Sequence, residues 1–160
     1  AFESAGYEVQ TVRLATIPFP KLLGEKNIND LPKFANNFSK AIQGVGISYA
    51  SLGPALPEFP KSYQVIPEAI SASENIFFSG AMTSDNNIHL AQVKACAEII
   101  VRNAPLDPNG FANLRFAALA NVKSGAPFFP AAYWNDDESA FAIAVESADV
   151  AVNADRKSVV

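Results

Sequence analysis

Residues 75–82 read NIFFSGAM, and this stretch decides the fold class. Its apolar residues follow one another without the polar alternation of a half-exposed strand. Such a run is typical of a strand that is buried on both faces, and such strands occur mainly in parallel sheets covered by helices. The sequence therefore predicts an α/β protein with a mostly parallel sheet.

Four more strands are expected around this one, from their β-branched residues and their alternating or apolar side chains. They cover residues 7–16, 47–53, 112–120 and 140–145. Apolar residues at helical spacing predict helices from residue 29 or 30 to the glycines at 44 and 46, over 68–72 and over 87–103. The proline-containing stretches 17–24 and 54–67 predict loops, and the tail after residue 146 resembles the start of a helix.

The composition narrows the classes of protein and of site. Charged residues make up 18% of the chain, below the usual value of about 25%, so a disordered chain is not expected. The net charge of -4, with no basic stripe, argues against nucleic-acid binding. A single Cys and a single His cannot form a Cys/His metal site, and no apolar run approaches the length of a membrane span. We expect a soluble, cytoplasmic protein without metal or cofactor.

The five expected strands and their helices form a single α/β unit over residues 1–160. Two interpretations of this unit are open. It is either a small complete domain, or one half of a larger barrel or sheet whose remainder lies on another chain. We favour the second, because the sequence begins with a helix-like fragment and finishes in an apparent helix.

Several long stretches resemble the domain of unknown function 711 family. They are AGYEVQTVRLATIPFP near the start, NGFANLRFAALANVKSGAPFFPAAY at 109–133, and FAIAVESADVAV after it. The resemblance covers nearly the whole chain but only the front portion of the family's sequence. It implies the ten-stranded α/β barrel of the pyruvate formate-lyase group, in which two parallel five-stranded halves lie antiparallel. This chain would be most of the N-terminal half, completed by a second polypeptide that is separately encoded or cleaved from one precursor.

The resemblance does not bring radical chemistry with it. Neither the glycine loop nor the cysteine loop of glycyl-radical enzymes is visible, and Cys96 falls within the helix expected at 87–103. We expect Cys96 to be a small buried packing residue. Similar sequences often have Tyr-His where this chain has Tyr133-Trp134, so an acid-base role for that histidine is absent.

Two arginines in otherwise apolar strands suggest an anion site. Arg13 and Arg115 each need a partner or water, because an unpaired buried charge is costly. A pair of guanidinium groups that line a barrel lumen would suit a carboxylate or a phosphate. The predicted substrate-binding residues are Arg13, Thr16, Asn113, Arg115 and Asn121. The alternative is that each arginine pairs with a local carboxylate.

Glu146 and Asp149 are the candidate catalytic residues. They lie about one helical turn apart, and a carboxylate pair can act as general acid and base where burial separates the two pKa values. Capping of a helix N-terminus is the alternative role. His89 is either part of a site or a surface histidine, and the aromatic loop at 127–134 either covers a pocket or buries a subunit contact.

Two functions follow from these candidates. The first is an enzyme subunit that binds a small anionic metabolite in a barrel lumen. The second is a non-catalytic structural subunit of a larger complex. In both cases we expect an oligomeric assembly, in which a second polypeptide buries more than about 2,000 Å² with this chain.

Overall fold

The computed structural model describes residues 2–85, 87–145 and 147–158 and shows a mixed α/β fold. Its central feature is a four-stranded sheet in which every pair of neighbouring strands is parallel. The strands, in their order across the sheet, are β1 (Arg13–Ala15), β2 (Tyr49–Ala55), β3 (Ile76–Ala81) and β6 (Phe116–Leu119). The predicted parallel sheet is confirmed, with the NIFFSGAM stretch as an inner strand.

Helices connect the strands. They are α1 (Phe19–Leu23), α2 (Leu31–Gly44), α3 (Ile66–Ser71), α4 (Leu90–Asn103) and α5 (Ala148–Ser158). Short 3-10 segments cover Glu3–Ala5, Glu25–Asp30, Pro60–Tyr63 and Pro108–Arg115, and β4 (Thr83–Ser84) pairs with β5 (Asn87–Ile88) as an antiparallel ladder. Pro32 lies in the first turn of α2, where its missing N–H costs nothing. No helix in these described ranges is long and apolar enough to span a membrane.

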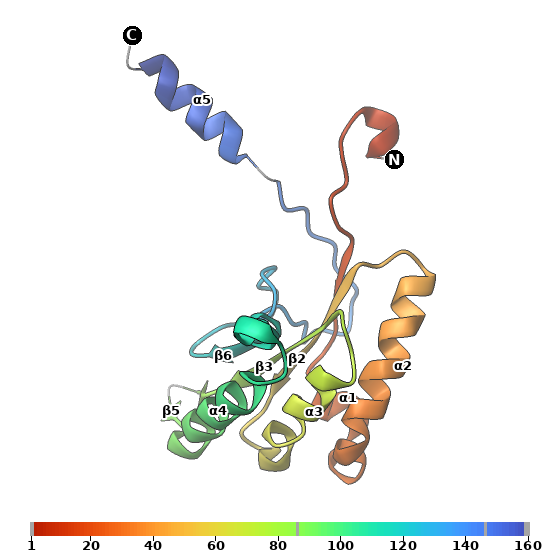
Figure 1. The fold of residues 1–160 in the computed structure, drawn as a ribbon, viewed down its shortest axis with the longest axis vertical. Helices are drawn as coiled ribbons and strands as arrows, with labels where there is room; N and C mark the ends of the chain where they lie inside the picture. The colour runs from red at the N-terminus through yellow and green to blue at the C-terminus, as the bar shows by residue number, and fades with distance from the viewer. Residues whose placement is uncertain (1, 86, 146, 159–160) are drawn as a thin grey trace.

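The order of the strands determines which face of the sheet the helices cover. Each new strand is added next to the previous one in the same direction, and crossovers between parallel strands are right-handed. Successive connecting helices therefore lie on the same side. Figure 1 shows α1 to α4 gathered on one side of the sheet, whereas the N-terminal segment and α5 extend away from it.

The hydrophobic core lies between these helices and the sheet. Phe78 of β3 packs edge-to-face on Phe19 of α1, with ring centroids 5.9 Å apart, and neither side chain is exposed. Gly80 of the same strand lies beneath Cys96 of α4, which is buried as predicted. Tyr63 adds a hydrogen bond from its hydroxyl to the carbonyl oxygen of Ala81, at 2.6 Å. This core fixes the helices against one face only.

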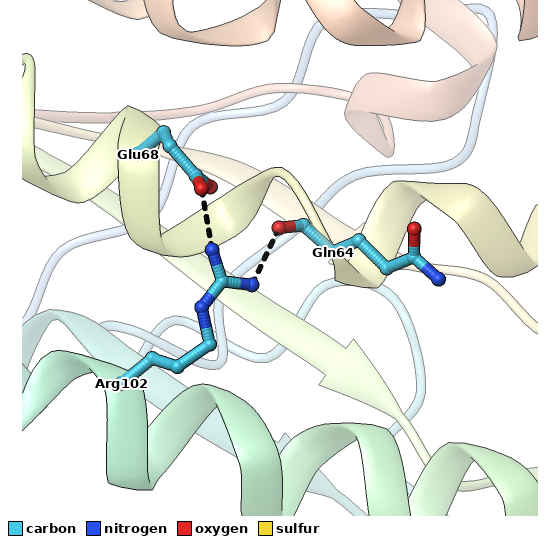
Figure 2. A network of polar contacts seen from close by, with 3 residues as sticks. All are labelled: Gln64, Glu68 and Arg102. Carbon is cyan, nitrogen blue, oxygen red and sulfur yellow. Dashed lines mark hydrogen bonds and ion pairs between the residues drawn. The ribbon is translucent and has the colours of Figure 1, made fainter.

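A polar clasp joins α3 to α4 at the surface (Figure 2). Arg102 donates from Nη1 to the carbonyl oxygen of Gln64 at 2.9 Å, and its Nη2 forms an ion pair with Glu68. The residues come from the turn before α3, from α3 and from the last turn of α4. The clasp therefore holds together the two helices that flank β3 in the chain.

The prediction of a fifth strand at 140–145 is wrong. These residues form no strand, and Phe141 and Val145 are both 80% exposed. Apolar alternation makes a strand possible, but a strand also needs a neighbour for its backbone hydrogen bonds. None of the strands in the described structure pairs with this segment.

Several element boundaries also differ from the prediction. The helix expected at 87–103 begins at Leu90, because Asn87–Ile88 form β5. Of the first expected strand, only Arg13–Ala15 lies in a strand, in register with β2, which begins opposite Arg13. Residues 112–115 belong to a 3-10 segment, so only the second half of 112–120 is a strand. Residues 17–24, expected to be a loop, contain α1, since Pro20 occupies the start of that helix and needs no N–H acceptor there.

Candidate functional site

The face of the sheet opposite the helices differs in its chemistry from the core face. The register aligns Arg13 with Tyr49 and Ser51 with Phe77, so these side chains share one face. We call this the helix-free face. It combines a charge, a hydroxyl group and aromatic rings, whereas the opposite face of the same strands is aliphatic and aromatic only.

The proline-aromatic loop at 122–135 covers part of the helix-free face. The Ser51 hydroxyl donates to the carbonyl oxygen of Ala132 at 2.6 Å, and Phe129 packs edge-on to Phe77 with centroids 5.4 Å apart. Gly53 lets the loop approach closely, since a Cβ there would lie 3.1 Å from the Cβ of Tyr133. Phe128, in contrast, is 74% exposed. The loop therefore shields the middle of the face within this chain.

Arg13 lies at the margin of this loop, at the amino end of β1, and is exposed. Its Nε donates to Thr11 Oγ1 at 3.0 Å. The guanidinium carbon lies 5.9 Å from the ring centroid of Tyr49 and 5.6 Å from that of Phe129. No carboxylate of the described residues lies within ion-pair distance of it. The group is thus held in place by one hydroxyl group and two aromatic rings.

Arg115 occupies a different place. It closes the 3-10 segment before β6 and donates from Nη1 to the carbonyl oxygen of Ser73. Burial lowers the pKa of Arg115, and the nearby Asp107 and Glu74 act in the opposite direction. These groups line an open pocket of about 350 Å³. Asp107 and Glu74 thus act on Arg115 through their charge, without an ion pair among the described residues.

The structure does not bring the two arginines together. β1 and β6 are the two edges of the sheet, with β2 and β3 between them. Three interstrand spacings of about 4.8 Å place the two edges about 14 Å apart. The two arginines therefore do not form a bidentate pair on one ligand within this sheet.

The other predicted binding residues are also spread out. Thr16 follows β1 and donates from Oγ1 to the carbonyl oxygen of Ile17 at 2.8 Å. Asn121 follows β6 with a φ of 56°, and its N–H donates to Thr83 Oγ1 at 2.8 Å. Asn113, expected in a strand beside Arg115, is instead in the 3-10 segment and donates to the carbonyl oxygen of Ile100. Thr16 and Asn121 do lie at the carboxyl ends of the two edge strands, where α/β proteins bind ligands.

The two candidate catalytic carboxylates are not both placed. Glu146 lies outside the described residues. The backbone of Asp149 is in the first turn of α5, which extends away from the sheet. No cluster of three metal-ligating side chains occurs in the described part of the chain.

Sequence reasoning missed the aromatic partners of Arg13, although it placed Thr11 on the same strand face. Thr11 precedes it by two residues, so a period-two reading places the two side chains together. Tyr49 and Phe129 come from elements that are 36 and 116 positions away, and only the register of β1 with β2 and the path of the loop bring them near. No local pattern could have indicated them.

The fold and this face define the class of the protein. It is an α/β protein with a singly wound parallel sheet that carries its helices on one face and, on the other, an arginine that forms no ion pair with a described carboxylate. The chain belongs to the DUF711 family, described as "Uncharacterised ACR (DUF711)", whose family model matches residues 1–159. The resemblance seen in the sequence is confirmed.

The chain is also similar to curated relatives from Neisseria meningitidis. A UPF0210 protein of serogroup C, serotype 2a, is 25% identical over 145 residues, which are 85% of this chain and 32% of the relative. A UPF0210 protein of serogroup B is 24% identical over the same shares. This chain thus spans about a third of the length of these relatives. No solved structure matches it.

Proposed function

We propose that this chain is one part of a larger α/β protein that binds a small carboxylate or phosphate compound on the helix-free face. The observation that carries the proposal is the state of Arg13. Its guanidinium is exposed, oriented and not neutralised by any described carboxylate. An arginine in this state is suited to recognise an anion.

The hydrogen bonding of Arg13 leaves its binding edge available. Guanidinium carries five N–H donors, of which only the one on Nε bonds Thr11. The rings of Tyr49 and Phe129 contact the cation without accepting these N–H groups in conventional hydrogen bonds. The Nη1 and Nη2 donors then match the two oxygens of a carboxylate or phosphate in bidentate geometry.

The helix-free face also calls for a cover that this chain supplies only in part. All-parallel sheets occur almost only with both faces covered, and here the helices lie on one side. The relatives are about three times as long as the matched segment. We propose that further strands, on the remaining polypeptide, close the sheet into a ten-stranded barrel and make the helix-free face its lumen.

A non-catalytic structural role is the second candidate, and a separate observation favours it. Residues 140–145 expose Phe141, Ile143 and Val145 at 80%, 63% and 80%. Such a strip of apolar side chains marks an interface more often than a ligand site. In that case the strip binds the rest of the assembly, and Arg13 contributes only to packing or to the solubility of the protein.

Thermal shift with a panel of anions separates the two candidates. Full-length protein is heated with phosphate, malonate or succinate, and sodium chloride is added to the reference to match ionic strength. An anion at a hundred times its Kd stabilises the native state by about 2.7 kcal/mol. We expect Arg13→Gln to abolish the shift and Arg13→Lys, which keeps the charge but loses the fork, to reduce it.

Arg115→Gln is the matched control, because Arg115 already has carboxylate neighbours. It should leave the anion-induced shift unchanged. If no anion stabilises the protein, or if Arg13→Gln responds like the wild type, the proposed binding is refuted and the structural role is favoured.

A further inference from the structure

A serine and a histidine meet on the hairpin that follows β3. Ser84 Oγ and His89 Nε2 lie 2.6 Å apart, and both residues are half-buried. The antiparallel β4–β5 ladder pairs Ser84 with Asn87, so the side chain of His89, two residues after Asn87, lies on the same side of the ladder as that of Ser84. The pair lies just beyond the carboxyl end of β3, at the edge of the sheet where parallel α/β proteins place their reactive groups.

Independent backbone contacts hold the pair in place. The His89 N–H donates to the carbonyl oxygen of Met82 at 2.9 Å, which ties the histidine to the end of β3. The His89 carbonyl oxygen accepts from Gln92 and Val93 as α4 begins. Next to Ser84, the Thr83 hydroxyl oxygen accepts the N–H of Asn121. Four elements thus converge on a contact between a hydroxyl and an imidazole.

We propose that Ser84 and His89 form a nucleophile and general-base pair that accepts an acyl group from small activated esters. With the imidazole proton on Nδ1, Nε2 accepts the Ser84 hydroxyl proton, which is the arrangement that activates a serine. His89 is also the residue before α4, and no side chain caps the helix there. In this proposal the N–H groups of Leu90 and Ala91, at the start of α4, serve as donors to the developing oxyanion.

The acyl transfer needs only the Ser84–His89 pair, the ester and water, and its bonds and protons are accounted for as follows. Ser84 Oγ forms a bond to the acyl carbon while its proton moves to His89 Nε2. The bond from the acyl carbon to the leaving oxygen breaks with its electron pair, and His89 returns the proton to that oxygen. In the second step the oxygen of a water molecule bonds to the acyl carbon while His89 Nε2 takes a proton from that water. The bond from the acyl carbon to Ser84 Oγ breaks with its electron pair, and His89 returns the proton to Ser84 Oγ. No oxidant, reductant or metal is needed.

The test uses p-nitrophenyl acetate and full-length protein. We expect release of p-nitrophenol and an acetyl group that peptide mass spectrometry places on Ser84. A general base raises the rate of such a step on the order of a hundredfold. His89→Asn should therefore slow the acetylation of Ser84 by about that factor. Ser84→Ala should abolish the adduct, and Ser139→Ala, an exposed serine elsewhere, should not. An absent adduct, or one that is insensitive to His89→Asn, overturns the proposal.

A second variant keeps the test informative if acetylation is slow. In Ser84→Cys the thiol takes the place of the hydroxyl beside His89, and iodoacetamide should modify it much faster than the buried Cys96. Adding His89→Asn should slow that alkylation at neutral pH, since the base is gone. Equal rates with and without His89 would refute the pairing. The anion-binding proposal is tested on variants of Arg13, so its outcome is independent of the outcome of this test.

Discussion

At the residue scale, the contact between Gly80 and Cys96 sets how closely α4 approaches the sheet. A Cβ at position 80 would lie 2.8 Å from Cys96 Sγ and 3.2 Å from a ring carbon of Tyr63. We expect Gly80→Ala to destabilise the protein by about 1–3 kcal/mol, as overpacking of a filled core does. Urea unfolding measures this cost.

A double-mutant cycle tests the cause of that cost. Cys96→Ala removes the sulfur atom and leaves the rest of the site in place. Gly80→Ala should therefore cost less in the Cys96→Ala background than in the wild type. Simple additivity of the two free-energy changes would show that the thiol is not the obstacle.

The same thiol gives a prediction about pH. Burial raises the pKa of Cys96 to about 11, above its ordinary value. Above the ordinary thiol pKa of about 8.5, the unfolded chain loses this proton while the native protein keeps it. Its contribution to stability is present below that pH and is lost as the pH rises toward 11, by at most about 1.4 kcal/mol per pH unit. Cys96→Ala should show a shallower decline in the free energy of unfolding between pH 8.5 and 11, and identical slopes would contradict this.

At the element scale, the clasp between α3 and α4 (Figure 2) makes a modest contribution. The Arg102 and Glu68 side chains are 44% and 55% exposed, so solvent weakens their ion pair. We expect Glu68→Gln to cost less than about 1 kcal/mol and Arg102→Ala to cost more, because it also loses the bond to Gln64. Lys94→Ala, which removes the far more exposed pair with Glu98, serves as control and should be near neutral. Chemical denaturation of the three variants checks this order.

The elements also show what could be predicted from sequence. The apolar run at 75–82 and the periodicity of α2 and α4 are local properties, and all three elements were predicted, although α4 begins at Leu90 and not at residue 87. The prediction of a strand at 140–145 was wrong because alternating apolar side chains indicate a segment that is able to form a strand. They do not indicate whether a neighbouring strand is present to pair with it. The prediction that Arg115 lies within a strand was wrong, because the chain turns through Asn109 and Gly110 into a 3-10 segment just before β6. Both of these residues have positive φ.

The candidate site was less predictable than the fold. The sequence singled out Arg13 as a charge within an apolar strand, and the structure shows it exposed on the helix-free face. The aromatic rings beside it depend on strand register and on a loop more than a hundred residues away, so they are non-local. Ser84 and His89 lie five residues apart but face each other only because a hairpin intervenes.

At the scale of the whole molecule, the exposed strip at 140–145 predicts an assembly defect. Replacing Phe141, Ile143 and Val145 with serine removes apolar side chains that make little contact within this chain. We expect the triple variant to retain its circular dichroism spectrum. If the proposed second polypeptide completes the assembly, the variant should no longer associate with it in size-exclusion chromatography. Val101→Ser, which changes an equally exposed valine on α4, should not affect assembly. Unchanged assembly of the triple variant would exclude the strip as an interface.

The helix-free face as an anion-binding surface is the central claim, and the guanidinium resonance of Arg13 reports on it directly. In full-length protein labelled with ¹⁵N-arginine, titration with phosphate or malonate should shift the Arg13 side-chain signals in a saturable way. The signals of Arg115 should stay in place. Saturable shifts at Arg115 but not at Arg13, or no saturable shift at either arginine, would contradict the account.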